Sequence, residues 1–195
     1  MSRGLGTTQE NRPGARVSRV SKGQAQYTVP NVCFRPIADI SAQCEFAMMQ
    51  SADDGIERVR SSFAKQGLMN TLGATLSNVS PVAVEIALRP DPSISQQHGF
   101  VHAGAVSAIA DTAAGYAALT LMSAGTGVLT TEFKINLLAP AIGDVISARG
   151  RVVKAGRTLT LAQTEVFAES GGQSKLIALL TATLMAVEGR EGVSD

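Results

Sequence analysis

One carboxylate stands in a long apolar stretch of this 195-residue chain. Residues 98–122 are rich in Ala, Val, Ile and Leu, and Asp111 is their only acidic residue. Burying a carboxylate is costly unless it is paired, hydrogen-bonded or facing a cavity, and burial raises its pKa. A carboxylate that faces a cavity can act as a general base or as a nucleophile. The sequence therefore singles out Asp111 for chemistry, against the alternative of a structural aspartate hydrogen-bonded to a neighbouring loop.

The elements around Asp111 are predicted from the period of the hydrophobic residues. The apolar stretch predicts a long helix enclosed by protein on all sides. Before it, residues 53–67 predict a short amphipathic helix, and residues 68–78 and 82–88 predict two strands. After it, runs at hairpin spacing predict an antiparallel meander of four strands, over residues 129–137, 145–154, 157–167 and 175–187. We therefore expect an α+β domain in which a curved six-stranded antiparallel sheet wraps around the central helix.

Composition excludes several classes of partner. The formal net charge is +1, aromatic residues make up 4% of the chain and no basic run is present, so nothing indicates nucleic-acid binding. No apolar run reaches the roughly 18 continuous residues that a membrane span needs. The first residues lack the apolar block of a secretory signal, and we expect a cytoplasmic protein.

Residues 1–47 differ in character from the rest of the chain. They show no sustained period, are rich in Ser, Gly, Arg and Gln, and hold six Lys or Arg against three acidic residues. We expect a disordered N-terminal extension, followed by a single domain over residues 48–195. The alternatives are a targeting or partner-binding tail, or a mis-assigned start with translation beginning at Met48 or Met49. Both cysteines fall in this segment, so the domain has none for a disulfide, a zinc site or a nucleophile.

Three stretches together resemble a known family. They are QQHGFVHAG at the entry to the central helix, AIADTAAG within it and TTEFKINLLAPAIGD after it. In order and spacing they are similar to the hotdog-fold acyl-CoA thioesterases of the phenylacetate-degradation (PaaI-like) type, over roughly residues 68–187. The resemblance implies a hotdog fold and hydrolysis of an acyl-CoA thioester to the free acid and CoA, without a cofactor.

The resemblance implies roles for residues at the start of the helix and within it. The family's His-Gly-Gly falls on His102, Ala103 and Gly104, and its catalytic carboxylate falls on Asp111. Ala103 keeps the amide that polarises the thioester carbonyl in such enzymes, but it places a methyl group beside the substrate. Amides in the first turn of a helix have no intrahelical partner and lie at the positive end of the macrodipole, so those of Ala103 and Gly104 suit an oxyanion. We expect His102 to hold the helix start rather than to carry a proton.

Four further residues are candidates for substrate binding. The family's Asn falls on Gln96, which is one methylene longer, and its strand hydroxyl falls on Thr130, counted back from Pro140. His98 lies on the loop that approaches the helix, where a substrate would pass. Arg157 lies in a cationic turn that could meet the phosphates of CoA. Each has a simpler alternative, because Thr is a common β-former and turn cations are usually only solvated.

Helix geometry adds a constraint on the site. Ala103 and Asp111 are eight residues apart, which is about 12 Å along a helix at 1.5 Å per residue. Both groups must lie within about 3 Å of one reacting centre. One chain cannot supply both, so we expect a site shared between the two protomers of a symmetric homodimer, as the resemblance also implies. Whether such dimers pair into a homotetramer is left open.

The sequence thus favours an acyl-CoA thioesterase for a medium-chain or aromatic acyl group. One alternative is a hotdog-fold hydratase or dehydratase with His98 and Asp111 as an acid/base pair. Another is a non-catalytic acyl-CoA-binding dimer in which Ala103 has weakened catalysis. No metal site is expected, because His98 and His102 are the only histidines and are too few for one.

Overall fold

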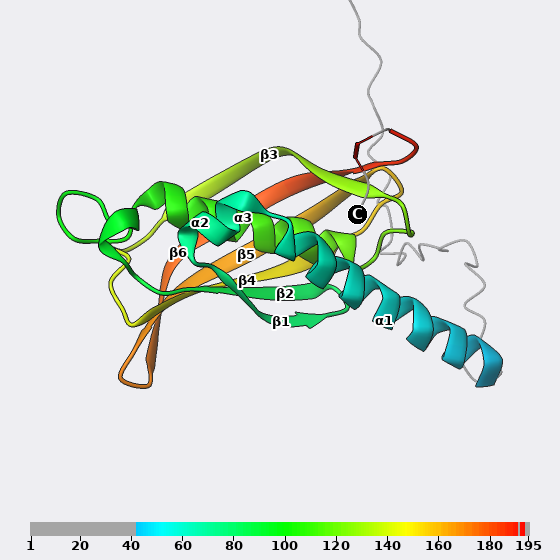
Figure 1. The fold of residues 1–195 in the computed structure, drawn as a ribbon, viewed down its shortest axis with the longest axis horizontal. Coiled ribbons are helices and arrows are strands. Elements are labelled where there is room, and N and C mark those ends of the chain that lie inside the picture. The colour runs from blue at the N-terminus through cyan, green and yellow to red at the C-terminus, as the bar shows by residue number, and fades with distance from the viewer. Residues whose placement is uncertain (1–41, 191, 194–195) are drawn as a thin grey trace, which may run out of the picture. The chain divides into compact units, whose positions relative to one another are not determined.

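The computed structural model describes residues 42–190, 192 and 193 (Figure 1). Side chains are described from residue 53 onward. The extension predicted over residues 1–47 therefore lies outside the described residues as far as position 41. The helices and strands are, in chain order, α1 (Ala42–Ala64), α2 (Gly67–Leu72), β1 (Thr75–Ser80), β2 (Ala83–Leu88), η2 (Pro92–Ile94), α3 (Ala103–Leu119), β3 (Gly127–Leu137), β4 (Val145–Lys154), β5 (Leu159–Ser170) and β6 (Gln173–Val187).

The first helix is longer than predicted. It begins at Ala42 rather than at residue 53, so Asp53 and Asp54 lie within α1 instead of at its start. The residues ahead of Asp53 are mostly Ala, Met, Gln and Glu, which are strong helix formers and extend the helix backwards. Of the described residues, none belongs to a helix both long and apolar enough to span a bilayer.

The strand predicted over residues 68–78 is wrong in its first half. Residues Gly67–Leu72 form α2, which buries Met69 and ends at Gly73 in the left-handed conformation, with φ 64°. Glycine is favoured there because it has no Cβ to clash. Of the apolar residues of this segment, α2 buries Met69 and leaves Leu68 exposed, and the strand begins only at Thr75.

All six strands form one antiparallel sheet in the order β1-β2-β4-β5-β6-β3. The predicted meander holds for β4, β5 and β6, but β3 pairs with β6 and not with β4. The link between β3 and β4 contains Pro140 and runs beside β6, where the amides of Leu138 and Ala139 donate to the carbonyl of Ile177 over 2.8 and 3.2 Å. Because these hydrogen bonds hold the link beside β6, it crosses from β3 to β4 without forming a hairpin between them. Strand β3 therefore lies at the edge of the sheet, next to β6.

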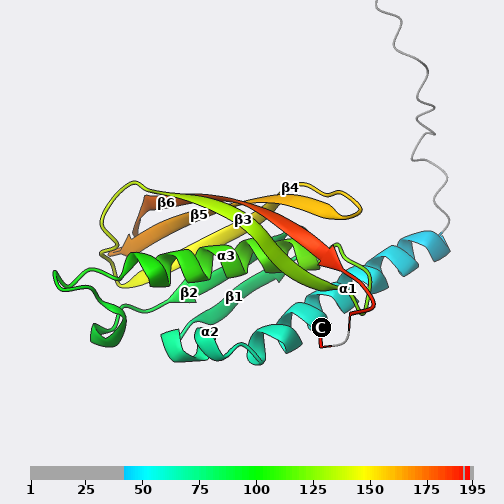
Figure 2. The same cartoon turned by 90° about the horizontal axis from the view of Figure 1, so that it is seen from above.

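The sheet curves around α3, as predicted (Figure 2). Small residues line the buried faces of α3 and bring the helix close to the strands. A Cβ added to Gly150 of β4 would overlap the carbonyl oxygen of Ala113. On β5, the hydroxyl of Thr164 donates a 2.9 Å hydrogen bond to the carbonyl of Ala110. The close packing fixes the position of α3, and with it every residue that the helix presents at its ends and sides.

Candidate active site

The start of α3 is capped by His102. Its Nδ1 accepts a 2.8 Å hydrogen bond from the backbone N–H of Gly104. A ring nitrogen that accepts is unprotonated, so in this arrangement the neutral imidazole carries its proton on Nε2. A Cβ added to Gly104 would lie 3.0 Å from Nδ1, which explains the glycine. His102 therefore holds the helix start.

The His102 cap makes the amides of Ala103 and Gly104 differ, although the sequence predicted that both suit an oxyanion. Gly104 gives its N–H to His102, whereas no acceptor among the described residues meets the N–H of Ala103. Ala103 is the first residue of α3 and is exposed. Its amide points away from the helix body at the positive end of the macrodipole. It is thus the amide that can receive a carbonyl oxygen from outside the chain.

A pocket of about 270 Å³ adjoins this helix start. It is lined largely by apolar side chains, including Leu137 and Pro140, together with Gln96, His102 and Ala103. Gln96 Oε1 accepts a 3.0 Å hydrogen bond from the backbone N–H of His98, which shapes the approaching loop. The side chain of His98 is exposed on that loop, beside the pocket and not in its lining.

Asp111 lies farther along α3 and contacts β3. Its Oδ1 accepts a 2.8 Å hydrogen bond from the hydroxyl of Thr130. Burial raises the pKa of this half-buried carboxyl above its ordinary value, and the Thr130 hydrogen bond partly offsets the rise by favouring the charged form. Asp111 and Thr130 line a second pocket, of about 290 Å³, together with Gln66, Thr112 and Tyr116. The carboxylate thus faces a cavity.

The two pockets are separate. None of the described residues lines both, since Ala103 belongs to the first and Asp111 to the second. The separation follows from the helix, which carries the two residues about 12 Å apart. A single protomer therefore holds the free amide and the carboxylate in two separate pockets.

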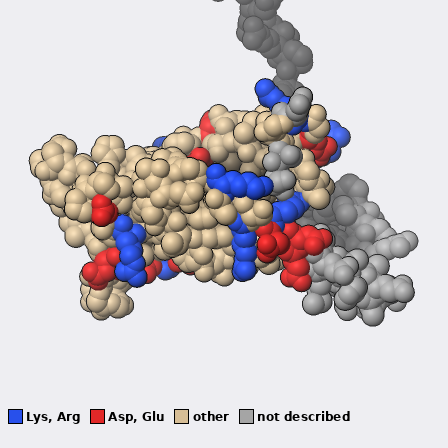
Figure 3. Space-filling model, viewed as in Figure 1, with Lys and Arg blue, Asp and Glu red and all other residues tan. Residues whose placement is uncertain are grey.

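Strand β3 forms one wall of both pockets and is an edge of the sheet. Phe133 and Leu137 pair with the buried Ala182 and Ala178 of β6, which places them on the α3 side of the sheet. They are nonetheless 46% and 54% exposed. Uncharged side chains cover most of the surface between α3 and β3 in the view of Figure 3. This edge combines free backbone hydrogen-bonding groups with exposed apolar side chains.

The structure does not bring Arg157 to Asp111. Arg157 is exposed in the turn between β4 and β5 and lines neither pocket. The register pairs Thr160 with Leu184 and Leu184 with Thr130, so Thr160 stands two strands from Thr130, about 10 Å away. The turn therefore lies toward the Asp111 end of the sheet but outside contact with the carboxylate.

Sequence reasoning missed three polar residues of the Asp111 pocket, which are Gln66, Thr112 and Tyr116. Gln66 Nε2 donates a 2.7 Å hydrogen bond to the hydroxyl of Tyr116, and that hydroxyl donates a 3.3 Å hydrogen bond to Ser62 Oγ. Tyr116 is five residues beyond Asp111 and is the only aromatic residue of α3, a signal that the sequence did offer. No local pattern marks Gln66, because its place depends on how α1 and α2 dock.

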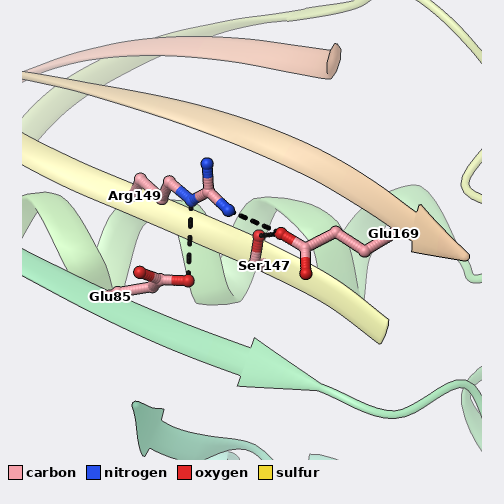
Figure 4. Close-up of polar contacts among 4 residues, drawn as sticks. All are labelled: Glu85, Ser147, Arg149 and Glu169. Atoms are coloured by element: carbon pink, nitrogen blue, oxygen red, sulfur yellow. Dashed lines mark hydrogen bonds and ion pairs between the residues drawn. The ribbon is translucent and has the colours of Figure 1, made fainter. Parts of the chain in front are cut away.

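A charged cluster lies outside both pockets, on the far side of the sheet from α3 (Figure 4). Arg149 of β4 bonds Glu169 of β5 over 2.6 Å and lies 3.5 Å from Glu85 of β2, while Ser147 donates to Glu169 over 2.8 Å. The guanidinium also stacks 4.6 Å from the ring centre of Phe167. These contacts join three strands and satisfy one another, so the cluster is structural. Within the described part of the chain, no group of three or more His, Cys, Asp or Glu residues could hold a metal ion.

Comparison with known proteins places this geometry in context. Residues 98–175, which include both Ala103 and Asp111, match the family model of the thioesterase superfamily. A solved thioesterase family protein from Silicibacter pomeroyi is 48% identical, with 69% of this chain and 99% of that chain covered and a TM-score of 0.68. No match was found among curated protein sequences.

Two more distant solved structures share the fold. The thioesterase HI1161 from Haemophilus influenzae is 21% identical, with 70% of this chain and 93% of that chain covered and a TM-score of 0.62. The PaaI protein from the phenylacetic acid degradation operon of E. coli is 18% identical, with coverage of 73% and 97% and a TM-score of 0.64. At these identities the likeness concerns the arrangement of helices and strands, which is the hotdog fold predicted from the sequence.

Proposed function

Since the chain belongs to the thioesterase superfamily and is a thioester hydrolase, we propose that it hydrolyses an acyl-CoA to the free acid and CoA at a site shared between two protomers. The observation that carries this proposal is the division of the site. The unpartnered amide of Ala103 and the carboxylate of Asp111 line different pockets of one protomer. Both must meet at one thioester carbonyl.

The exposed edge beside both pockets supports a partner subunit. Phe133 and Leu137 leave about half of their surface uncovered on a strand with a free edge. Soluble proteins rarely leave such a strand unprotected. A symmetric dimer that covers it can place Ala103 of the partner subunit opposite Asp111, and symmetry then gives two equivalent sites.

Asp111 supplies the reactive group. As a general base it takes a proton from water, and the resulting hydroxide attacks the thioester carbonyl carbon. As a nucleophile it attacks that carbon itself, giving an anhydride that water then hydrolyses. Either route passes through a tetrahedral intermediate that expels the CoA sulfur. In the general-base route Asp111 returns its proton to the sulfur, and in the nucleophilic route the CoA thiolate leaves and takes a proton from solvent. Both routes need the ionised carboxylate, which the hydrogen bond from Thr130 favours.

The helix start supplies the oxyanion stabiliser. The amide of Ala103 donates to the carbonyl oxygen as negative charge develops on it, helped by the positive end of the α3 macrodipole. His102 acts on this step only through its bond to Gly104, which fixes the first turn, and so it is a positioning residue. The methyl group of Ala103 narrows the approach of the substrate to the amide.

The remaining candidates bind the substrate. The substrate is a medium-chain or aromatic acyl-CoA, and the largely apolar pocket beside Gln96 and His102 contacts it next to the Ala103 amide. His98 stands on the exposed loop at its mouth. We assign Arg157 to the phosphates of CoA, since it is an exposed cation on the turn at the Asp111 end of the sheet.

The test is release of free thiol from a panel of acyl-CoAs of different chain length and of aromatic acyl-CoAs. Asp111→Asn should lower kcat/KM by at least about a hundredfold, the usual contribution of a positioned base. Asp54→Asn is the matched control, because Asp54 is an exposed carboxylate on α1 outside both pockets. Full activity in Asp111→Asn would rule out the assignment.

A further inference from the structure

The Asp111 pocket adjoins another cavity. A second cavity, of about 230 Å³, follows it along the groove between α3 and β3. Ser62, Leu119 and Val193 line only the second cavity, whereas Asp111 and Thr130 line only the first. The two cavities share Gln66, Tyr116 and Val128. These three residues therefore form the boundary between them.

Hydrogen bonds close this boundary. Gln66 Nε2 donates to the Tyr116 hydroxyl over 2.7 Å, and that hydroxyl donates to Ser62 Oγ over 3.3 Å. Tyr116 is only 3% exposed, and its ring packs against Phe63, with 6.1 Å between the ring centres. The Tyr116 hydroxyl thus accepts from Gln66 and donates to Ser62, and this chain of hydrogen bonds holds the side chains of Gln66 and Tyr116 across the groove.

The backbone that carries Gln66 is itself fixed. Gln66 precedes α2, and its carbonyl accepts from the amide of Asn70 over 3.1 Å. The preceding helix is tied to the end of α3 by Arg58, which donates to the carbonyls of Met122 and Leu119 over 2.9 and 3.1 Å. Gly55 allows close approach, because a Cβ there would lie 2.8 Å from the carbonyl oxygen of Thr120. The barrier between the cavities is therefore part of the packed structure and not a loose side chain.

We propose that the Gln66–Tyr116 hydrogen bond is a partition that sets the length of acyl group the enzyme accepts. The inference rests on the proposed function, with the acyl group lying in the Asp111 cavity. An acyl chain that enters there meets the two polar side chains and stops. Among the medium-chain and aromatic acyl groups of the proposed function, the preferred ones are thus the compact groups that fit the Asp111 cavity, which are the shorter chains or a single aromatic ring. From the Asp111 cavity, an acyl chain enters the second cavity only when the partition is removed.

The experiment measures kcat/KM for straight-chain acyl-CoAs from acetyl to dodecanoyl and for phenylacetyl-CoA. Gln66→Ala should shift the optimum to longer chains. The gain should be about fourfold for each methylene that enters the second cavity, the factor that burial of one CH₂ contributes. The gain should appear mainly as a lower KM, because the added contact lies away from the reacting carbonyl. Lys65→Ala is the matched control, because Lys65 is exposed and lines neither cavity.

Tyr116→Phe provides a second variant that keeps the ring and its packing. It removes only the hydroxyl, so Gln66 loses its acceptor and can swing aside, and a smaller shift in the same direction is expected. This variant decides the question if circular dichroism shows that Gln66→Ala is unfolded. An unchanged chain-length preference in the folded, active variants overturns the partition and leaves the hydrolase assignment standing. Absence of turnover of every acyl-CoA by the unmodified protein overturns the proposed function, and the partition with it.

Discussion

The hydroxyl of Thr130 donates a 2.8 Å hydrogen bond to Oδ1 of Asp111, and it joins the edge strand β3 to the central helix at the candidate reaction centre. A donor to a carboxylate stabilises the charged form and lowers the pKa. Burial of Asp111 acts in the opposite direction and is the larger effect. The protonation state of Asp111 therefore depends on a strand residue that a partner subunit would cover.

The first prediction concerns this hydrogen bond. Thr130→Val keeps the side-chain shape but removes the donor, so the pKa of Asp111 should rise further. The acidic limb of the kcat/KM profile should move to higher pH by about one unit, since a hydrogen bond to a charged group contributes roughly 1.5 to 3 kcal/mol and this one is partly exposed. Thr130→Ser should keep the original profile. Thr131→Val is the control, because Thr131 bonds the carbonyl of Thr183 and not Asp111; an identical profile in Thr130→Val contradicts the account.

The second prediction concerns stability. Because burial raises the pKa of Asp111, the folded protein binds that proton more tightly than the unfolded chain does. The free energy of unfolding should then fall as pH rises through the unfolded and folded pKa values, and the penalty is fully present at neutral pH. Asp111→Asn removes the charge and should raise Tm at pH 7, with the difference disappearing below about pH 3. Thermal melts of both proteins at both pH values check this. A lower Tm for Asp111→Asn than for the unmodified protein at pH 7 would contradict the claim that burial of the Asp111 carboxylate destabilises the fold.

The third prediction concerns the methyl group at the helix start. Ala103→Gly keeps the backbone amide and removes the methyl group beside the substrate. We expect higher kcat/KM for the bulkier acyl-CoAs and little change for acetyl-CoA, with a small loss of helix stability of at most about 1 kcal/mol. Steady-state kinetics over the acyl-CoA panel measures the effect. Equal changes for small and bulky substrates would show that the methyl group does not restrict access.

The fourth prediction concerns the contact that seats α3 on the sheet. A Cβ at Gly150 overlaps the carbonyl oxygen of Ala113, so Gly150→Ala should destabilise the fold by about 1 to 3 kcal/mol as an overpacked core does. Gly115→Ala is the matched control, since a Cβ there meets nothing within 4 Å and alanine favours the helix. Urea unfolding of both variants gives the comparison. A stable Gly150→Ala protein would mean that helix and strand can separate without cost.

The fold was largely predictable because its central elements carry strong periods. The apolar stretch around Asp111 predicted α3, alternation predicted β2 and β3, and runs at hairpin spacing between turns predicted β4, β5 and β6. The position of β3 was not predictable from period, because its pairing with β6 is set by the long link through Pro140 and not by a local turn. Short apolar runs are ambiguous between helix and strand, which is why α2 was misread.

The candidate site was predictable to the extent that it lies on one helix and its flanks. Asp111, Ala103 and Thr130 were found from residue types, spacing and a family resemblance. The different states of the Ala103 and Gly104 amides were not, because they depend on the orientation of the His102 ring. Gln66 was missed for a similar reason, since only the docking of α1 and α2 brings it to Tyr116.

The division of the site between protomers can be tested most directly by mixing two inactive variants. Asp111→Asn lacks the carboxylate. Ala103→Pro lacks the amide N–H, and it should still fold because proline is favoured at the first position of a helix and the extended backbone of His102, with ψ 139°, suits a residue before proline. Each variant alone should release almost no thiol from acyl-CoA.

In a mixed dimer, one site combines both defects and the other combines an intact Asp111 with an intact Ala103. After the two variants are unfolded together and refolded at equal amounts, half of the dimers are mixed, and thiol release should recover to about a quarter of the wild-type rate. That recovery is the result the account predicts. No recovery, with mixed dimers present by native mass spectrometry, would contradict a site shared between protomers.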